Sequence, residues 1–217
     1  MGEEVELAAK TTAEVVTALT EASGALGPPQ EFWGALTSGI HYRFYPRVVK
    51  QAMAAAEKIE QSGLPRRAYA EIPDRLLKAI LEGGSIEDDG SMQERWANLL
   101  ANGLTESRAA VHTDFPRVLG ELEPVEAATL DLLADRLPFS HSPEGHEFQP
   151  EEIESVGISG PNLDNLVRAG LLRYTRKMDT TVGTITDAGL TVSGATFTDF
   201  GWAFVQACRE PLIAECD

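Results

Sequence analysis

Hydrophobic side chains in the first 122 residues recur every three or four positions, which is the spacing of one helix face. Proline and glycine interrupt this pattern, because proline lacks the amide donor and glycine accepts the conformations that end helices. The pattern predicts helices over residues 3–23, about 31–61 with a bend at Pro46, 74–83, 91–103 and about 113–122. We therefore expect residues 1–122 to form an all-helical domain.

The pattern changes after residue 122. It predicts helices over residues 124–137, 150–155 and 162–169, short strands over 171–175 and 195–198, and a last helix capped by Asp199. The glycine- and threonine-rich residues 180–194 fit a hairpin or wing between the strands. This order is typical of a winged helix-turn-helix. We predict a mainly α fold in which a winged helix-turn-helix-like α+β domain, residues 123–217, follows the helical domain.

Residues 91–103 contain a complete set of helix signals. Ser91 and Glu94 have the spacing of a capping box, and Gly103 is placed to end the helix. One face of this helix carries Met92, Trp96, Leu99 and Leu100. We expect this face to be buried in the first domain, with Glu94 and Arg95 on the opposite, solvated face.

The net charge of the 217-residue chain is −16, and residues 123–217 alone carry 6 basic against 16 acidic side chains. Nonspecific binding of nucleic acid needs clustered cations, so this balance argues against it for the chain as a whole. No stretch is long and apolar enough for a membrane span, and the acidic N-terminus does not resemble a signal peptide. We expect a cytoplasmic protein whose Cys208 and Cys216 are reduced thiols.

A basic stripe lies on the predicted helix around residue 50, with aromatic side chains at its start. Its cations share one helix face and are Arg43, Arg47, Lys50 and Lys58. Such a stripe fits nucleic acid, anionic lipid or an acidic protein partner. We favour internal pairing with carboxylates of the same chain or of a second copy, because acidic side chains are in large surplus.

A weaker basic patch falls in the predicted winged helix. Residues with nucleic-acid-binding chemistry there are Asn162, Asn165, Arg168, Arg173, Arg176 and Lys177. Asn and Arg side chains read base edges, but Asp164 and Asp179 lower the local charge. We therefore favour a protein-binding or dimerising module over a DNA-binding one.

No residue pattern identifies a reaction. His141 and His146 are five residues apart across a proline and a glycine, which is not the helical spacing of a zinc site. The acidic residues 87–89 lack the alternating ligands of a calcium loop. We find no nucleophile elbow and no phosphate-binding loop. We predict no catalytic residue, no metal site and no cofactor, and we favour a protein that is not an enzyme.

The order of several motifs resembles the abortive-infection alpha (Abi-alpha) family of bacterial proteins. The motifs are residues 72–82, 85–89 and 93–102, an aromatic and basic stretch at 41–45, and downstream segments at 115–127, 170–172 and 198–208. The central motif contains Glu94, Arg95, Trp96, Asn98, Leu99 and Leu100, to which we assign a structural role. Phe197 departs mildly from the family pattern, which has leucine there.

The resemblance implies bacterial defence against phage, in which infected cells stop growing or die, and it implies no catalytic residue. We expect a non-enzymatic abortive infection protein that acts through self-association or a protein partner. The alternatives are a winged-helix DNA-binding regulator and a membrane-acting toxin that inserts residues 25–40.

Overall fold

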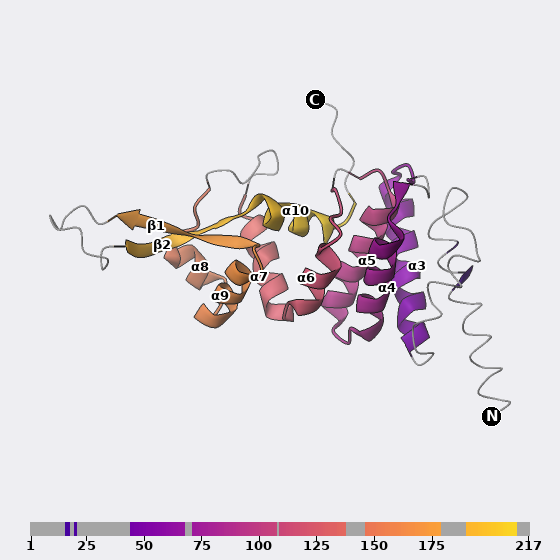
Figure 1. The fold of residues 1–217 in the computed structure, drawn as a ribbon, viewed down its shortest axis with the longest axis horizontal. Coiled ribbons are helices and arrows are strands. Elements are labelled where there is room, and N and C mark those ends of the chain that lie inside the picture. The colour runs from indigo at the N-terminus through magenta and orange to yellow at the C-terminus, as the bar shows by residue number, and fades with distance from the viewer. Residues whose placement is uncertain are drawn as a thin grey trace. The chain divides into compact units, whose positions relative to one another are not determined.

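The computed structural model describes residues 16–17, 20, 44–67, 71–107, 109–137, 146–178 and 190–211. These residues form a mainly helical fold, with eight helices and one two-stranded sheet (Figure 1). The chain divides into two compact units: residues 1–121 together with 206–217, and residues 122–205. None of the described helices is long and apolar enough to cross a membrane. Most of the predicted helix over residues 3–23, and residues 25–40, lie outside the described residues.

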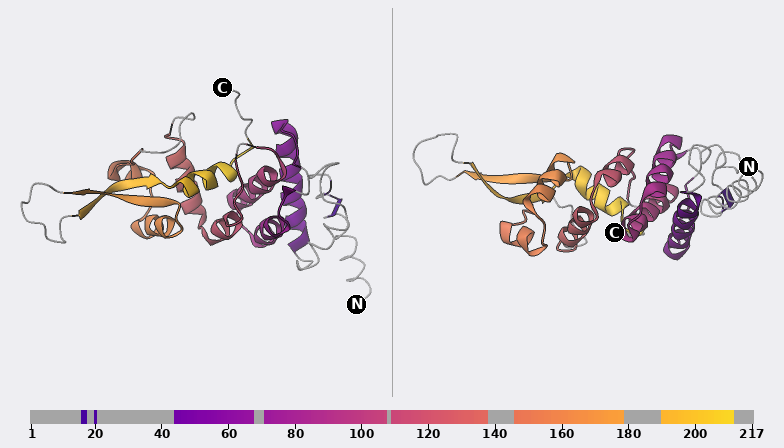
Figure 2. Two further views of the ribbon diagram at one scale, coloured as in Figure 1. Left: turned by 45° about the horizontal axis from the view of Figure 1, so that its top comes forward. Right: turned by 90° about the horizontal axis from the view of Figure 1, so that it is seen from below.

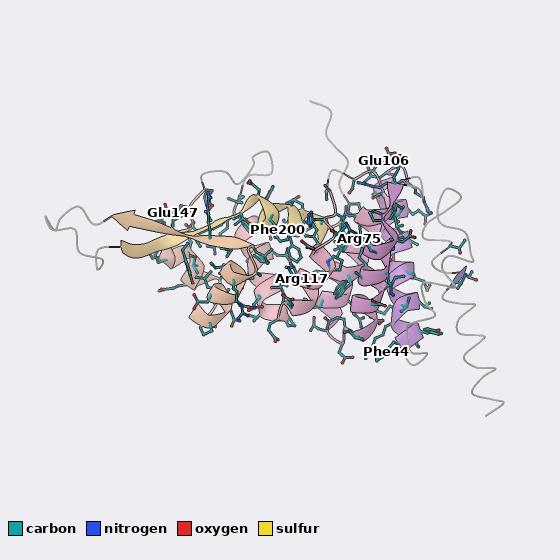
Figure 3. The ribbon with its side chains drawn as sticks, in the orientation of Figure 1. Phe44, Arg75, Glu106, Arg117, Glu147 and Phe200 are labelled. Atoms are coloured by element: carbon teal, nitrogen blue, oxygen red, sulfur yellow. The ribbon has the colours of Figure 1, made fainter. Side chains whose placement is uncertain are left out.

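The first unit is a group of packed helices. They are α3 (Tyr45–Ser62), α4 (Asp74–Ile86), α5 (Gly90–Leu104) and α6 (Phe115–Glu121). Helices α3, α4 and α5 pack on one another, and α6 packs on α4 and α5. Figure 3 shows the side chains of the described residues on the ribbon. The apolar ones buried in this unit include Val48, Leu77, Ile80, Trp96, Leu99 and Phe115, each at most 1% exposed.

Helix α3 begins at Tyr45, with Pro46 in its first turn. The predicted bend at Pro46 is therefore wrong: proline at this position removes no helical hydrogen bond, because the first amides of a helix have no partner in it. The helix ends at Gly63, whose φ of 63° is left-handed and whose amide donates to the Glu60 carbonyl. This glycine is the stop that the sequence predicts.

Helix α4 runs through Gly83 and Gly84 to Ile86, so the predicted end at these glycines is wrong. A Cβ atom at Gly83 would lie 2.2 Å from the Trp96 ring, and one at Gly84 would lie 2.4 Å from Gln51 Oε1. These glycines allow close approach of neighbouring helices and do not terminate α4.

Both predicted ends of α5 also differ from the structure. Asp89 caps the helix: its Oδ1 accepts hydrogen bonds from the amides of Ser91 and Met92, at 2.9 and 3.0 Å. Asp89 also accepts a hydrogen bond from the Ser91 hydroxyl. This bond has the largest effect on the pKa of Asp89, and together with the two amide bonds it lowers that pKa. Gly103 is helical, and α5 continues to Leu104. The residue that caps α5 is therefore Asp89, two residues before the predicted Ser91.

The second unit combines short helices with an antiparallel strand pair. Its helices are α7 (Pro124–Ala134), α8 (Pro150–Ser155), α9 (Gly160–Arg168) and most of α10 (Asp199–Ala207); its strands are β1 (Leu172–Met178) and β2 (Leu190–Phe197). Leu172 pairs with Phe197, and the register shifts between Thr175 and Arg176. Helix α8 contacts β2, whereas α9 contacts β1 and α7 (Figure 2).

Helix α10 begins after Thr198, whose hydroxyl accepts the amide of Gly201 at 2.8 Å. Thr198 is therefore the N-cap, and the predicted cap, Asp199, is the first helical residue. The predicted second unit, residues 123–217, contains the whole C-terminus, whereas the structure groups residues 206–217 with the first unit. Side chains of α5 hold the backbone of this segment, as described below.

Candidate functional site on α3

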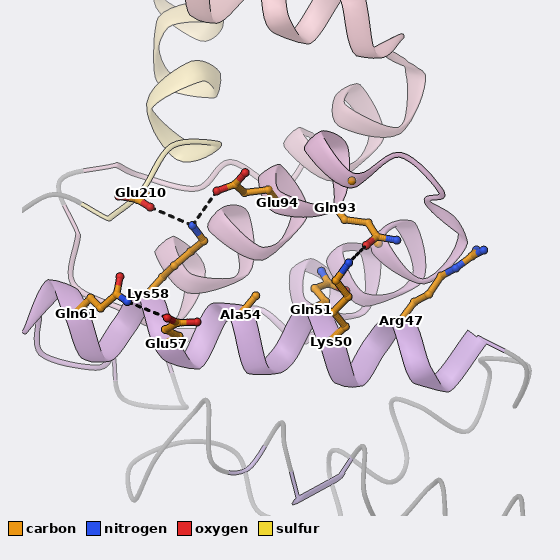
Figure 4. A pocket seen from close by; sticks show the side chains of 12 residues that line it. Arg47, Lys50, Gln51, Ala54, Glu57, Lys58, Gln61, Gln93, Glu94 and Glu210 are labelled. Atoms are coloured by element: carbon orange, nitrogen blue, oxygen red, sulfur yellow. Dashed lines mark hydrogen bonds and ion pairs between the residues drawn. The ribbon is translucent and has the colours of Figure 1, made fainter.

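One face of α3 lines a polar pocket of about 320 Å³ in the first unit (Figure 4). Gln51 lies on this face, and Arg47 and Lys50 lie toward one end, whereas Lys58 and Gln61 lie toward the other. The opposite wall comes from Gly84, Gly90, Gln93, Glu94 and Glu210. The predicted basic stripe is therefore one wall of this pocket, except for Arg43, which lies outside the described residues.

Two cations of the stripe pair with carboxylates of the same chain. Arg47 forms an ion pair with Asp88, and its guanidinium also donates to the Ser85 carbonyl at 3.4 Å. Lys58 Nζ lies 3.4 Å from Glu94 and 3.2 Å from Glu210. The carboxylates are largely exposed, so each pair contributes little to stability, about 0–1 kcal/mol. The pairs nevertheless leave less positive charge for an outside polyanion.

Lys50 has a different environment, because its Nζ donates to the neutral amide oxygen of Gln93 at 2.9 Å. It stands between the polar pocket and a second hollow of about 630 Å³ on the other side of α3. We call this second surface the outer face of α3; it consists of Pro46, Val49, Lys50, Met53, Ala54, Ala56, Glu57 and Glu60. Met53, one of these residues, is 61% exposed.

Gln51 connects α3 to its neighbours beneath the polar pocket. The residue is 5% exposed, and its Nε2 donates to the carbonyls of Ile80 and Trp96, both at 3.3 Å. These carbonyls fix the orientation of the amide, because a flipped Gln51 would point its oxygen at both. Sequence reasoning missed this residue. The available signal was a polar side chain among the apolar positions of the buried helix face.

The Trp96 side of α5 is buried, and from Trp96 to Leu104 the helix is buried on every side. Trp96 is 1% exposed and Leu99 and Leu100 are fully buried. Glu94 faces Lys58, and Arg95 donates to the Ser91 carbonyl one turn earlier at 3.0 Å. The predicted buried face is confirmed, whereas the predicted solvated face is limited to the first turns of the helix, where Glu94 is exposed.

The two asparagines of α5 bind the backbone at the end of α10. Asn98 Nδ2 donates to the Cys208 carbonyl at 2.9 Å. Asn102 Nδ2 donates to the carbonyls of Ala207 and Arg209 at 2.9 and 2.8 Å. The last carbonyls of a helix have no partner within it, so Asn102 caps α10 at Ala207, and both asparagines hold the two residues that follow the helix. Asn102 was missed from sequence; its spacing of four from Asn98 places both on one face of α5.

We expect Asn102→Ala to lower the free energy of unfolding by about 1–2 kcal/mol, because it strips buried carbonyls of their donor. Denaturant unfolding followed by circular dichroism measures this change in free energy. Amide hydrogen exchange should also become faster at residues 206–211. Gln61→Ala, on the exposed end of α3, is the matched amide control. Equal exchange in Asn102→Ala and the wild type would contradict the assigned capping role.

Side chains predicted to contact nucleic acid in the second unit are partly engaged in internal hydrogen bonds. Asn165 Nδ2 donates to both oxygens of the buried Glu126 carboxylate, at 2.9 and 3.0 Å, and Arg168 donates to Asn165 Oδ1. Asn162 accepts the Ser159 hydroxyl at 3.0 Å. Arg173 is exposed, and the side chains of Arg176 and Lys177 lie outside the described part. Asn165 therefore links α9 to α7.

Tyr174 on β1 also binds α9, through a hydrogen bond that its hydroxyl donates to Asp164. Burial, followed by this hydrogen bond, raises the pKa of Tyr174 to about 12. The neutral phenol is thus the form that the fold favours. Ionisation destabilises the folded unit only as the pH rises from about 10 towards 12.

Metal-binding chemistry was not predicted for this chain. Within the described residues, no group of three or more His, Cys, Asp or Glu side chains is arranged to hold a metal ion. His146 is exposed and stacks edge-on against Phe148, with ring centroids 4.8 Å apart. His141 lies outside the described residues.

Comparison with protein families extends the sequence argument. Residues 47–208 match the model of a family described as abortive infection alpha, a segment that runs from the first turns of α3 to the residue after α10. Comparisons with curated proteins and with solved structures found no match. The family is associated with abortive infection, the response that limits phage infection of bacteria. Because the match covers most of the chain, the protein belongs to the abortive infection alpha family.

Proposed function

We propose that this protein acts in abortive infection by binding protein, either a second copy of itself or a partner, through the outer face of α3. The observation that carries this proposal is the exposure of Met53, 61%, in a hollow that Pro46, Val49 and Ala56 also line. Methionine is enriched at protein interfaces, and it adapts to irregular partners because its side chain is unbranched and flexible.

The charges near this face support protein binding over polyanion binding. Arg47 and Lys58 are paired with carboxylates of the chain. On the outer face itself, one lysine is accompanied by Glu57 and Glu60. A surface with both signs of charge around an apolar centre suits a protein surface better than a row of phosphates.

For residues 122–205 we propose a winged helix-turn-helix-like module that binds protein and not DNA. Its helices α8 and α9 precede the strand pair, as that motif requires. The favoured role is supported by Asn165, whose amide has the chemistry to read adenine but is hydrogen-bonded to Glu126. Salt-sensitive DNA binding that Arg168→Ala and Arg173→Ala abolish would contradict the assignment.

The proposed interface is tested by Met53→Glu. We expect this variant to fold normally, because the side chain is exposed, and to lose protection of a bacterial host against phage. A charge in the centre of an interface weakens association by about 2 kcal/mol or more, roughly 30-fold. The measurements are phage plating efficiency and the melting temperature of the purified variant.

Ile86→Glu provides a matched control, because Ile86 is another exposed apolar residue of the first unit, 64% exposed, at the end of α4. We expect this variant to protect the host as well as the wild type does. If Met53→Glu also retained full protection, the outer face of α3 would not be the functional surface.

A further inference from the structure

The outer face of α3 carries opposite charges on either side of its apolar centre. Lys50 lies three residues before Met53, and Glu57 lies three residues after Ala54. In the described part of the chain, Lys50 has only the neutral Gln93 amide as a partner, and Glu57 has only the Gln61 amide, at 3.0 Å. No ion pair of Lys50, Glu57 or Glu60 occurs among the described residues.

Lys50 and Glu57 do not neutralise each other within one helix. They are two turns apart on the same side of α3 (Figure 4), a separation of roughly 10 Å along the axis. Side chains pair along a helix at three or four residues, not at seven. Both charges are exposed and available to an outside surface.

We infer that this surface is a site of self-association, in which the α3 helices of two copies pack antiparallel about a two-fold axis between Met53 and Ala54. This inference deepens the proposed function and rests on it for its biological meaning. In a two-fold contact, residues at equal distances from the axis face each other. Lys50 then faces Glu57 of the partner subunit, and the same pair forms again on the other side of the axis.

The apolar positions fit this arrangement. The spacing of the apolar residues alternates between three and four, which is the pattern of the a and d positions in a pair of packed helices. These residues are Pro46, Val49, Met53 and Ala56. Lys50 and Glu57 both follow a d position, so both occupy the flanking e position, where charges select the orientation of the helices. A parallel pair in register would place like residues at the same level and lose this match.

The contact is short, because it involves little more than four turns of one helix per copy. Interfaces of this size are at the small end of specific protein contacts. We therefore expect association that depends on protein concentration, with monomer and dimer in exchange. Such an equilibrium is sensitive to a single pair of charges.

Charge reversal in the full chain tests the arrangement. The mass of each variant in solution is measured by sedimentation over a range of protein concentrations. Lys50→Glu and Glu57→Lys each create two like-charge contacts in a homodimer, so each should raise the dissociation constant by about tenfold or more. The double variant, Lys50→Glu with Glu57→Lys, should restore the dimer. An equimolar mixture of the two single variants should do the same, because the mixed dimer contains two opposite-charge pairs.

Lys78→Glu is the control, because Lys78 is an exposed lysine on α4 with the same change of charge, and it should associate like the wild type. A wild-type chain that stays monomeric at every concentration would overturn the inference, as would a mixture of single variants that fails to associate. If Met53→Glu removes protection while none of the charge reversals changes the mass, the face binds another protein: the proposed function then stands and the self-association does not.

Discussion

Replacing Trp96 by alanine is expected to lower the free energy of unfolding of the first unit by about 3–5 kcal/mol, or to unfold it. Trp96 is 1% exposed in the middle of α5, and its ring packs against Gly83 of α4. Alanine would leave a cavity that these helices fill only in part. The loss of stability therefore exceeds the free energy that burial of the ring contributes. Denaturant unfolding followed by circular dichroism measures the change.

The contact with Gly83 gives this prediction a second, independent test. Gly83→Ala places a Cβ atom 2.2 Å from the ring and should be destabilising, whereas Gly90→Ala, with no atom within 4 Å, should be nearly neutral. The cost of Gly83→Ala should shrink in a Trp96→Leu background, because the two sites are coupled. If Trp96→Ala kept its melting temperature but lost protection against phage, the tryptophan would be a functional contact and not a core residue.

Gly201→Ala is expected to destabilise the second unit by more than about 2 kcal/mol. A Cβ atom at this position would lie 1.9 Å from the Leu171 carbonyl oxygen and 2.6 Å from its carbon. Backbone atoms cannot move aside as a side chain does, so the steric cost should reach or exceed the usual upper value of about 3 kcal/mol. The higher helix propensity of alanine offsets only about 1 kcal/mol of this destabilisation.

The effect should appear as a lower melting temperature and as faster hydrogen exchange in β1 and α10. Gly160→Ala is the control, because Gly160 begins α9 and a Cβ atom there meets no atom within 4 Å. We expect that variant to remain within about 0.5 kcal/mol of the wild type. Equal stability of both variants would contradict the close approach of α10 to the Leu171 backbone.

Sequence reasoning succeeds in α5 and in α8. The spacing of Met92, Trp96, Leu99 and Leu100 predicts a buried helix face, and the structure buries all four. Helix α8 has the bounds predicted from Pro150, because proline at a first helical position is a strong local signal. Both cases depend on residues within a few turns of one another, so the sequence contains all the information needed.

Glycine is where the same reasoning failed most clearly. Gly83 and Gly84 look like a helix end in sequence, but each lies opposite a side chain from another helix, Trp96 and Gln51 respectively. The same residue type at Gly63 and Gly170 does adopt a left-handed φ. Whether a glycine ends a helix or admits a neighbour depends on packing partners that are distant in sequence.

Within the described residues, the order of the helices, the position of the strand pair and the buried side of α5 all follow from the sequence, as does the family. The spacing of hydrophobic residues and the residues that begin or end helices are sufficient to predict these features, because both signals act over one or two turns. The tertiary structure alone decided which polar side chains are engaged: Asn98 and Asn102 with carbonyls more than a hundred residues away, Asn165 with Glu126, and Lys58 with Glu210. Hydrogen bonds and ion pairs are short-range, so they form only between groups that the fold has already brought together.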